Sequence, residues 1–404
     1  MNFLFEDNNY SAFEQVSRST SSSLGPLAIA HTVGNEEMAE RVSSHIFEMR
    51  KQRIINNPEK AINHPGYMRK SYIINSDCIR FSSGEGKAVY RESVRGHDLT
   101  ILADVTNHSR SYKVFGHDTP YSPDDHFQDI KRLILASSNH ARRINVVMPY
   151  LYQGKQDIRA ERESLDCACA LKELIELGAH SIICFEPHEP RVENAISTVG
   201  LDNFPTSYLL IEKLLEDKNG IVFTPDKLSI VSPDEGGMKR AVYYSSVLGL
   251  QLSTFYRERD YNRLVDGSHP VNAIRFLGEE VKNKDVLIID DMISSGQTML
   301  QTAYELKEHQ GAKNIYCVCT FPLFTQGIEE FNQAYKSGLI KKVYGTNLIH
   351  HPEDLLKSPW YVDADASPLI AKIIDVINHD LSTSGLMDQT ARINQLLENR
   401  QHEV

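Results

Sequence analysis

One segment of the sequence combines acidic residues with a small-residue turn, in an order suited to binding a phosphorylated sugar. An apolar run, Val286–Ile289, is followed by two adjacent carboxylates, Asp290 and Asp291, and a helical pattern resumes at Met299. The carboxylates can hold ribose hydroxyls directly or through Mg²⁺. Backbone N–H groups at a turn and a helix start can hold a phosphate, and the candidates are Ser294, Ser295, Gly296, Gln297 and Thr298. Alone, the segment also fits an ordinary strand that ends in an acidic turn.

A second apolar run ends in a glycine-rich polar turn, IVSPDEGGMKR, at residues 230–240. Glycine allows a backbone to approach a ligand closely, and open α/β sheets bind ligands at the carboxyl ends of their strands. We therefore expect Asp234 to converge with Asp290 and Asp291 at one sheet edge. Structural turn chemistry is the alternative for Asp234.

His188 follows a third apolar run and has Glu186 and Glu189 as neighbours. Histidines are often structural or exposed. At this strand end a metal or phosphate contact is as good an interpretation as a structural role. Histidine and carboxylates are ordinary contacts of a magnesium nucleotide.

Two basic loops also follow apolar runs. Arginine suits bidentate phosphate contacts and the charge that develops on a transferring phosphoryl group. Runs of basic residues usually lie on a solvated surface. In a chain that also carries a ribose-binding segment, however, two such loops favour the binding of a triphosphate. The loops carry Lys155, Arg159 and Arg162, and then Arg257, Arg259 and Arg263.

The composition suits a globular protein of about two domains, with 404 residues of which 41% are hydrophobic. No apolar run approaches the ~20 residues of a membrane span, and the N-terminus lacks the pattern of a signal peptide. We expect a cytoplasmic protein. The net charge of −11 argues against general binding to nucleic acid or membrane surfaces. The six cysteines lack C-x-x-C spacing and are expected to be buried free thiols.

Short apolar strands alternate with amphipathic helices along the chain, a pattern typical of parallel sheets in doubly wound α/β domains. The pattern restarts near Phe204–Pro205. Ser122 or Asp124 is a candidate helix cap. Residues 51–70 and 107–124 look like irregular insertions. The predicted parts are a leader at 1–26, domains at 27–204 and 205–362, and a C-terminal helical segment at 363–404 that packs back.

Together these segments resemble ribose-phosphate pyrophosphokinases (phosphoribosyl pyrophosphate synthetases) from about residue 27 to the C-terminus. The matching motifs are RFSSGE with ESVRG at 80–96, PYLYQGKQD at 149–157, His188, SPDEGGMKR at 232–240, YRER at 256–259, DDMISSGQT at 290–298 and TNL at 346–348. The resemblance implies two phosphoribosyltransferase-like α/β domains, each with a mainly parallel sheet, related by pseudo-symmetry. It also implies a homo-oligomer, a dimer or hexamer.

In that family the C1 hydroxyl of ribose 5-phosphate attacks the β-phosphorus of MgATP, and AMP leaves. By matching position, the ATP-binding residues would be Phe81, Glu85, Lys155, Gln156 and Asp157, with His188 at the nucleotide-bound metal. Asp290 and Asp291 would hold the ribose hydroxyls and Mg²⁺, with help from Asp234, and Ser294–Thr298 would hold the 5′-phosphate. Arg257 and Arg259 would neutralise the transferring group.

Three positions depart from the family pattern. Ser294 and Ser83 stand where acids are usual, and Arg257 stands where the catalytic lysine is usual. The insertions and the leader have no counterpart in the family pattern and could alter assembly.

These departures keep other functions open. Ser294 and the insertions favour a 5′-extended acceptor such as ADP-ribose. The replacement at Arg257 favours a catalytically silent regulatory homologue, although the intact acidic motifs oppose this reading. A phosphoribosyltransferase would share the DDM motif without needing the KQD segment or His188.

Overall fold

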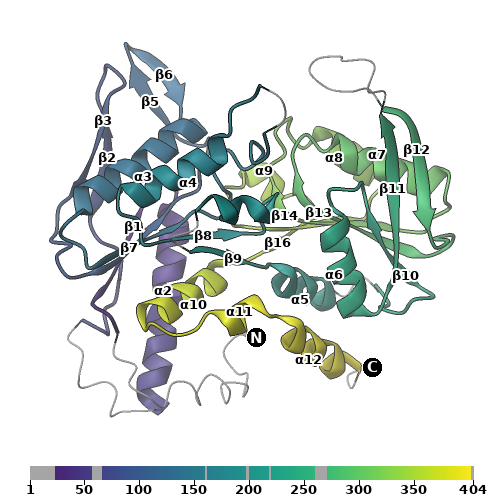
Figure 1. The fold of residues 1–404 in the computed structure, drawn as a ribbon. Coiled ribbons are helices and arrows are strands. Elements are labelled where there is room, and N and C mark those ends of the chain that lie inside the picture. Colours follow the sequence, from purple (N-terminus) through teal and green to yellow (C-terminus); the bar gives the residue numbers. More distant parts are fainter. Residues whose placement is uncertain are drawn as a thin grey trace. The chain divides into compact units, whose positions relative to one another are not determined.

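The computed structural model describes residues 23–56, 66–159, 162–196, 200–217, 220–259 and 271–401. The chain forms two compact units (Figure 1). The first comprises Met1–Pro205, Leu348–His350 and Asp365–Asp388, and the second comprises Thr206–Asn347, His351–Ala364 and Gln389–Val404. Most of the predicted leader lies outside the described residues. No helix in the described ranges is long and apolar enough to cross a membrane.

The first unit is built on a five-stranded parallel sheet in the order β1-β4-β7-β8-β9. Its strands are apolar on both faces because helices cover both sides. The strands are β1 (Leu27–His31), β4 (Asp98–Leu102), β7 (Arg143–Val147), β8 (Ser181–Phe185) and β9 (Leu201–Phe204). The helices are α2 (Glu36–Asn56), α3 (Pro123–Ser137), α4 (Asp166–Glu176), the 3₁₀ helix η3 (Pro190–Ala195), α10 (Ser367–Asn378) and α11 (Ser384–Met387).

The second unit is built on a seven-stranded sheet in the order β12-β11-β10-β13-β14-β15-β16, in which β12 pairs antiparallel to β11 and the other pairs are parallel. The strands are β10 (Leu228–Ser232), β11 (Gln251–Arg259), β12 (Val271–Gly278), β13 (Asp285–Ile293), β14 (Ile315–Pro322), β15 (Lys342–Thr346) and β16 (Tyr361–Ala364). The helices are α5 (Ser207–Glu216), α6 (Met238–Leu248), α7 (Gln297–Glu308), α8 (Glu329–Lys336), α9 (Glu353–Leu356) and α12 (Thr390–Gln401).

The two sheets share one strand order. In the second unit the chain starts at β10, steps to β11 on one side, and then adds β13, β14 and β15 on the other. In the first unit Ile73 bridges Ile29 of β1 in parallel, so the chain makes the same outward step before adding β4, β7 and β8 on the other side. This is the doubly wound order that reverses next to the first strand. The predicted fold class, two phosphoribosyltransferase-like α/β halves, is confirmed.

Both predicted insertions contain regular structure, which corrects the expectation of irregular loops. Helix α2 continues to Asn56, and residues 57–65 lie outside the described part of the chain. Residues 107–124 contain a β-hairpin of β5 (Ser111–Val114) and β6 (His117–Pro120). Ser122 then caps α3 in a capping box with Asp125. A second hairpin, β2 (Ser76–Arg80) and β3 (Gly86–Tyr90), packs on α3.

The cysteine expectation holds with one correction. All six cysteines are free thiols, but Cys169 is exposed and Cys78 only half-buried, whereas the other four are buried. Cys169 lies on the solvent face of α4, opposite the buried Cys167 and Leu171.

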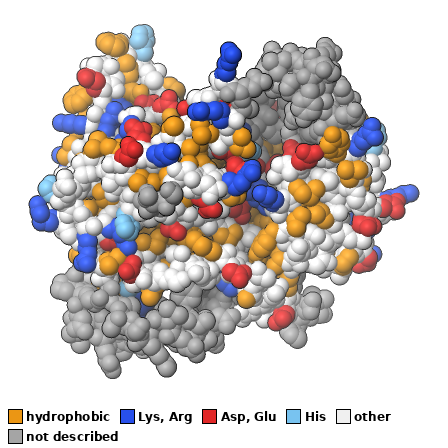
Figure 2. All heavy atoms as spheres, in the orientation of Figure 1, with side chains coloured by type: hydrophobic (Ala, Val, Ile, Leu, Met, Phe, Trp, Pro, Cys, Tyr) orange, Lys and Arg blue, Asp and Glu red, His pale blue; other side chains and the backbone are white. Residues whose placement is uncertain are grey.

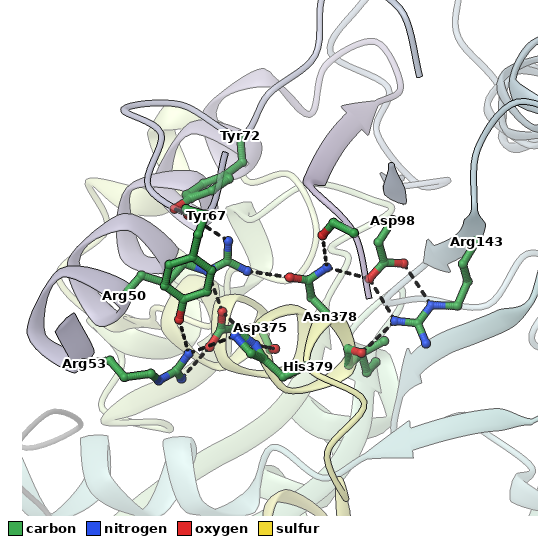
Figure 3. A network of polar contacts seen from close by, with 11 residues as sticks. Arg50, Arg53, Tyr67, Tyr72, Asp98, Arg143, Asp375, Asn378 and His379 are labelled. Atoms are coloured by element: carbon green, nitrogen blue, oxygen red, sulfur yellow. Dashed lines mark hydrogen bonds and ion pairs between the residues drawn. The ribbon is translucent and has the colours of Figure 1, made fainter. Parts of the chain in front are cut away.

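A buried polar network joins α10 to α2 within the first unit (Figure 3). The Asp375 carboxylate accepts from Arg50 Nε at 2.7 Å and from Arg53 Nη2 at 2.6 Å. Asn378 accepts from Arg50 and donates to Asp98, at the start of β4. The network lies at the amino-terminal edge of the sheet and anchors residues 365–388 there. The predicted C-terminal segment 363–404 is therefore divided, since residues 389–404 belong to the second unit.

Candidate functional site

Asp234, Asp290 and Asp291 come from two neighbouring strands of the second unit. Strands β10 and β13 pair in parallel up to Val231 and Ile288, so both chains leave the sheet at the same edge. The strand order reverses between these two strands, and open α/β sheets bind ligands at that point. The predicted convergence of the three acids agrees with the electrostatic coupling described below.

The two adjacent acids lie inside a strand that continues beyond the predicted apolar run. Strand β13 extends to Ile293, and Asp290 pairs with Cys319 of β14. The extension exists because β14 itself continues to Pro322 and supplies a pairing partner, whereas β10 ends earlier at Ser232. The two carboxylates therefore lie on the part of β13 that extends past the end of β10.

The Asp290 carboxyl is strongly perturbed. Burial raises its pKa well above the usual value, and the negative charges of Asp291 and then Asp234 raise it further. Asp290 also accepts a hydrogen bond from the Asp291 backbone N–H at 2.9 Å. Placing carboxylates this close together is unfavourable for their charged forms, and such arrangements are typical of sites that bind cations or transfer protons.

The acidic side chains of this site suit Mg²⁺ shared with a substrate better than a metal ion bound by protein ligands alone. No group of three or more potential ligands is assembled among the described residues. Magnesium usually keeps several waters and takes one or two carboxylates together with substrate oxygens. Asp290 fits that demand. Asp234 fits less directly, because its Oδ1 already accepts from the N–H groups of Gly236 at 2.9 Å and Gly237 at 3.3 Å.

The turn after β13 is shaped for a ligand. Gly296 has φ of +88°, and a Cβ atom there would overlap the Phe331 ring, so the position requires glycine. Helix α7 begins directly after it, and its N-cap residue, Gly296, has no side chain to cap the first turn. The Gln297 N–H makes only a long contact of 3.5 Å with Ser295 Oγ, so this N-terminus suits a phosphate. Ser294 is held in place by its carbonyl, which accepts from the Thr325 N–H at 2.9 Å.

Arg257 and Arg259 lie on strand β11 and not in the basic loop predicted from the sequence. Their backbones pair with Ile274 and Val271 of β12, with an irregularity between Glu258 and Arg259. The side chains of both arginines, and residues 260–270, lie outside the described part.

The KQD segment and His188 follow neighbouring parallel strands, β7 and β8, in the first unit. The His188 Nδ1 lies 3.0 Å from the carboxylate of Asp157, whose side chain is 5% exposed, so Nε2 is the ring nitrogen left for contact with a ligand. Gln153 and Glu186 have φ of 55° and 39°, uncommon values for residues other than glycine. Two strained backbones at adjacent strand ends are typical of a functional site.

Two other residues predicted to contact the nucleotide directly precede Asp157 in the sequence, and two more lie in a separate hairpin. Lys155 is exposed, and Gln156 donates to the Ser164 carbonyl at 2.8 Å. Phe81 and Glu85 lie in the turn of the β2–β3 hairpin, where Ser83 donates to the Glu85 carboxylate at 2.9 Å. The described contacts bring Asp157 and His188 together but do not include Phe81 or Glu85.

Two further residues, not predicted from the sequence, support the site. Asn203 accepts from the strained Glu186 N–H at 2.9 Å, and Phe331 packs beneath Gly296. Both act across strands or from a later helix, so no local pattern could have identified them.

Comparisons with known proteins agree with this architecture. A family model described as the N-terminal domain of ribose phosphate pyrophosphokinase matches residues 27–178, and the phosphoribosyl transferase domain matches residues 200–354. The chain belongs to the ribose-phosphate pyrophosphokinase family. The predicted enzyme class is confirmed with it.

Two curated relatives of this ribose-phosphate pyrophosphokinase family member share little more than a quarter of their aligned residues with it. The chain is 27% identical over 311 residues to "Ribose-phosphate pyrophosphokinase" of Staphylococcus aureus, covering 76% of this chain and 88% of that protein. It is 28% identical over 314 residues to the Bacillus caldolyticus protein of the same name, with the same coverage. A crystal structure of phosphoribosylpyrophosphate synthetase from Mycobacterium smegmatis shares the fold, with a TM-score of 0.67 and 20% identity over 88% of this chain and 99% of that one.

Proposed function

We propose that this protein transfers the diphosphoryl group of ATP to the C1 hydroxyl of ribose 5-phosphate, forming 5-phosphoribosyl 1-diphosphate and AMP. The observation that carries the proposal is the arrangement at β13 and α7. A carboxylate whose pKa is raised by burial and by its acidic neighbours lies on the strand that leads into the N-terminus of α7, at a glycine that admits no side chain. One end of this arrangement suits a metal-bound sugar and the other a phosphate.

The second unit would hold the acceptor. Asp290 and Asp291 would orient the ribose hydroxyls, assisted by Asp234, and would share Mg²⁺ with the substrates. Residues 294–298 would hold the 5′-phosphate with backbone N–H groups and the Ser294, Ser295 and Thr298 hydroxyls. The sugar would thereby be fixed at both ends, which supplies the positioning that phosphoryl-type transfer chiefly needs.

The first unit would hold the nucleotide. Lys155 and Gln156 would contact ATP, and the His188 imidazole, oriented by Asp157, would contact its metal. Phe81 and Glu85 would recognise the adenine. When bound, Mg²⁺ would offset the charge of the phosphate oxygens.

The transfer forms one bond and breaks one. The C1 oxygen bonds to the β-phosphorus, the bond between that phosphorus and the oxygen bridging to the α-phosphorus breaks, and AMP leaves with that oxygen. The hydroxyl proton is released. Arg257 and Arg259 would neutralise the transferring group. We further propose a cytoplasmic homo-oligomer, a dimer or hexamer, on the basis of the family resemblance.

Ser294 favours a second candidate acceptor. Aspartate at this position would narrow the pocket around a terminal phosphate, whereas serine is smaller and neutral. The pocket would then tolerate a phosphate that continues into a diphosphate bridge, as in ADP-ribose. The donor chemistry would be unchanged.

The Ser294→Asp variant tests the choice of acceptor. We expect it to shift the ratio of kcat/KM for ribose 5-phosphate over ADP-ribose about tenfold toward ribose 5-phosphate, the change that 1.4 kcal/mol produces. AMP release from ATP with each acceptor measures the ratio. If the wild type releases no AMP with ADP-ribose and the variant leaves ribose 5-phosphate kinetics unchanged, the extended acceptor is excluded.

A further inference from the structure

The β5–β6 hairpin is fixed against the hairpin that carries the proposed adenine contacts. The Arg80 guanidinium carbon lies 5.3 Å from the ring centre of Tyr112, in β5, and 5.1 Å from that of Tyr121, directly after β6. Arg80 is itself held by Asp129 of α3, with an N–O distance of 2.5 Å. Arg80 therefore connects both hairpins to helix α3 through its contacts with the two tyrosine rings and with Asp129.

The tips of the two hairpins also touch. The Phe115 N–H donates to the carbonyl of Ser82 at 2.9 Å. Gly84 lies so close to the Val114 side chain that a Cβ atom on it would be 3.6 Å away. The turn that holds Phe81 and Glu85 is thus in direct contact with the β5–β6 turn.

Phe115 occupies a position that its side chain does not favour. Its φ is 48°, and that of Gly116 is 85°, the pattern of a two-residue turn that prefers Asn-Gly. A bulky residue with positive φ is a genuine outlier. The side chain is 79% exposed, so burial within the chain does not offset the strain. Figure 2 shows hydrophobic side chains gathered at the tip of this hairpin.

We propose that Phe115 is a second aromatic contact for the nucleobase of ATP, beside Phe81. Phe81 is 45% exposed, with the Lys87 ammonium 5.6 Å from its ring centre. A planar base can stack on one ring and contact another, and aromatic stacking on bases tolerates different bases. This inference rests on the proposed function, because that function places the nucleobase at the Phe81 turn.

The test removes the ring without removing the turn. Asparagine adopts positive φ readily, so Phe115→Asn should keep or increase the thermal stability of the full-length protein. We expect it to weaken binding of α,β-methylene-ATP with Mg²⁺ about tenfold, measured by calorimetry. Binding of inorganic tripolyphosphate, which has no base, should be unchanged. Phe115→Trp should bind the analogue like the wild type.

A control variant and separate outcomes distinguish a failure of this inference from a failure of the proposed function. Leu135→Gln removes another exposed apolar side chain, on α3, and should leave analogue binding unchanged. Equal analogue affinities for the wild type and Phe115→Asn would overturn the inference while leaving the proposed reaction intact. So would a change in oligomeric state without a change in affinity. Absence of AMP formation by the wild type would instead count against the proposed function.

Discussion

Replacing both Asp290 and Asp291 by asparagine is expected to lower AMP formation by at least about 10³-fold, with the protein still folded. Loss of one preorganised electrostatic contact typically costs 10²–10³-fold, and this variant removes two charges that would organise sugar and metal. Asparagine keeps the size and the polarity of each side chain. Steady-state AMP release from ATP with ribose 5-phosphate measures the loss.

The stability of the single variant Asp290→Asn separates this role from a structural one. Burial and neighbouring charge raise the pKa of Asp290 in the folded chain. An acid with a raised pKa destabilises the fold once pH rises through the interval between its unfolded and folded pKa values. Neutralising it should therefore maintain or increase stability near pH 7. Mg²⁺ should stabilise the wild type more than the variant.

Asp285→Asn is the matched control. Asp285 starts the same strand at the opposite sheet edge, where it accepts from Asn314 Nδ2 at 2.8 Å. We expect activity to change little. Wild-type-like activity in the double variant of Asp290 and Asp291, within tenfold, would rule out the assigned roles.

Asp375→Ala is expected to destabilise the first unit by about 3–5 kcal/mol, because removal of one partner leaves buried charge uncompensated. Asp375 is 2% exposed and Arg50 is 1% exposed, and the two arginines around the carboxylate would lose their counter-ion. Two-unit proteins need not unfold in one step. Hydrogen exchange of peptides from α2 and α10 therefore measures the effect locally.

Asp380→Ala provides the comparison for a charge at the same end of α10. Asp380 is 71% exposed and lies 3.5 Å from Arg143, so its loss should cost no more than about 1 kcal/mol. If both variants changed exchange equally, the network in Figure 3 would not be the anchor of the C-terminal segment.

The same network predicts a loss of stability in acid. Burial lowers the pKa of His379, so the unfolded chain takes up its proton first as pH falls below about 6.5. Arg53 and Arg50 hold the pKa of Asp375 below its usual value against the effect of burial. Its contribution is present above the unfolded pKa of about 4 and is lost below it. Asp375→Ala should abolish this second, more acidic loss and should not remove the first, because the Asp375 charge opposes the lowering of the His379 pKa.

Local sequence predicted the features that contiguous residues specify. The strand, acids, glycine turn and helix around Asp290 follow one another in the chain, as do the turn at Asp234 and the cap at Ser122. Their order along the chain also predicted the two α/β halves. Each of these features depends on backbone preferences and hydrophobic periodicity over a few residues.

Features that depend on distant partners escaped prediction. Strand β13 continues to Ile293 because β14 extends beside it. The pair of Arg50 and Asp375 joins residues 325 positions apart. The β5–β6 turn carries phenylalanine where asparagine is usual, so its sequence did not resemble a hairpin. In each case tertiary contacts outweigh local preference.

Diphosphoryl transfer is best tested with ATP carrying radioactive phosphorus at the β position, incubated with Mg²⁺ and ribose 5-phosphate. We expect the label to appear in a ribose 1-diphosphate product, with one unlabelled AMP formed for each labelled product. Retention of the label in ADP, as in transfer of the γ-phosphoryl group alone, or AMP formation independent of the acceptor, would contradict it.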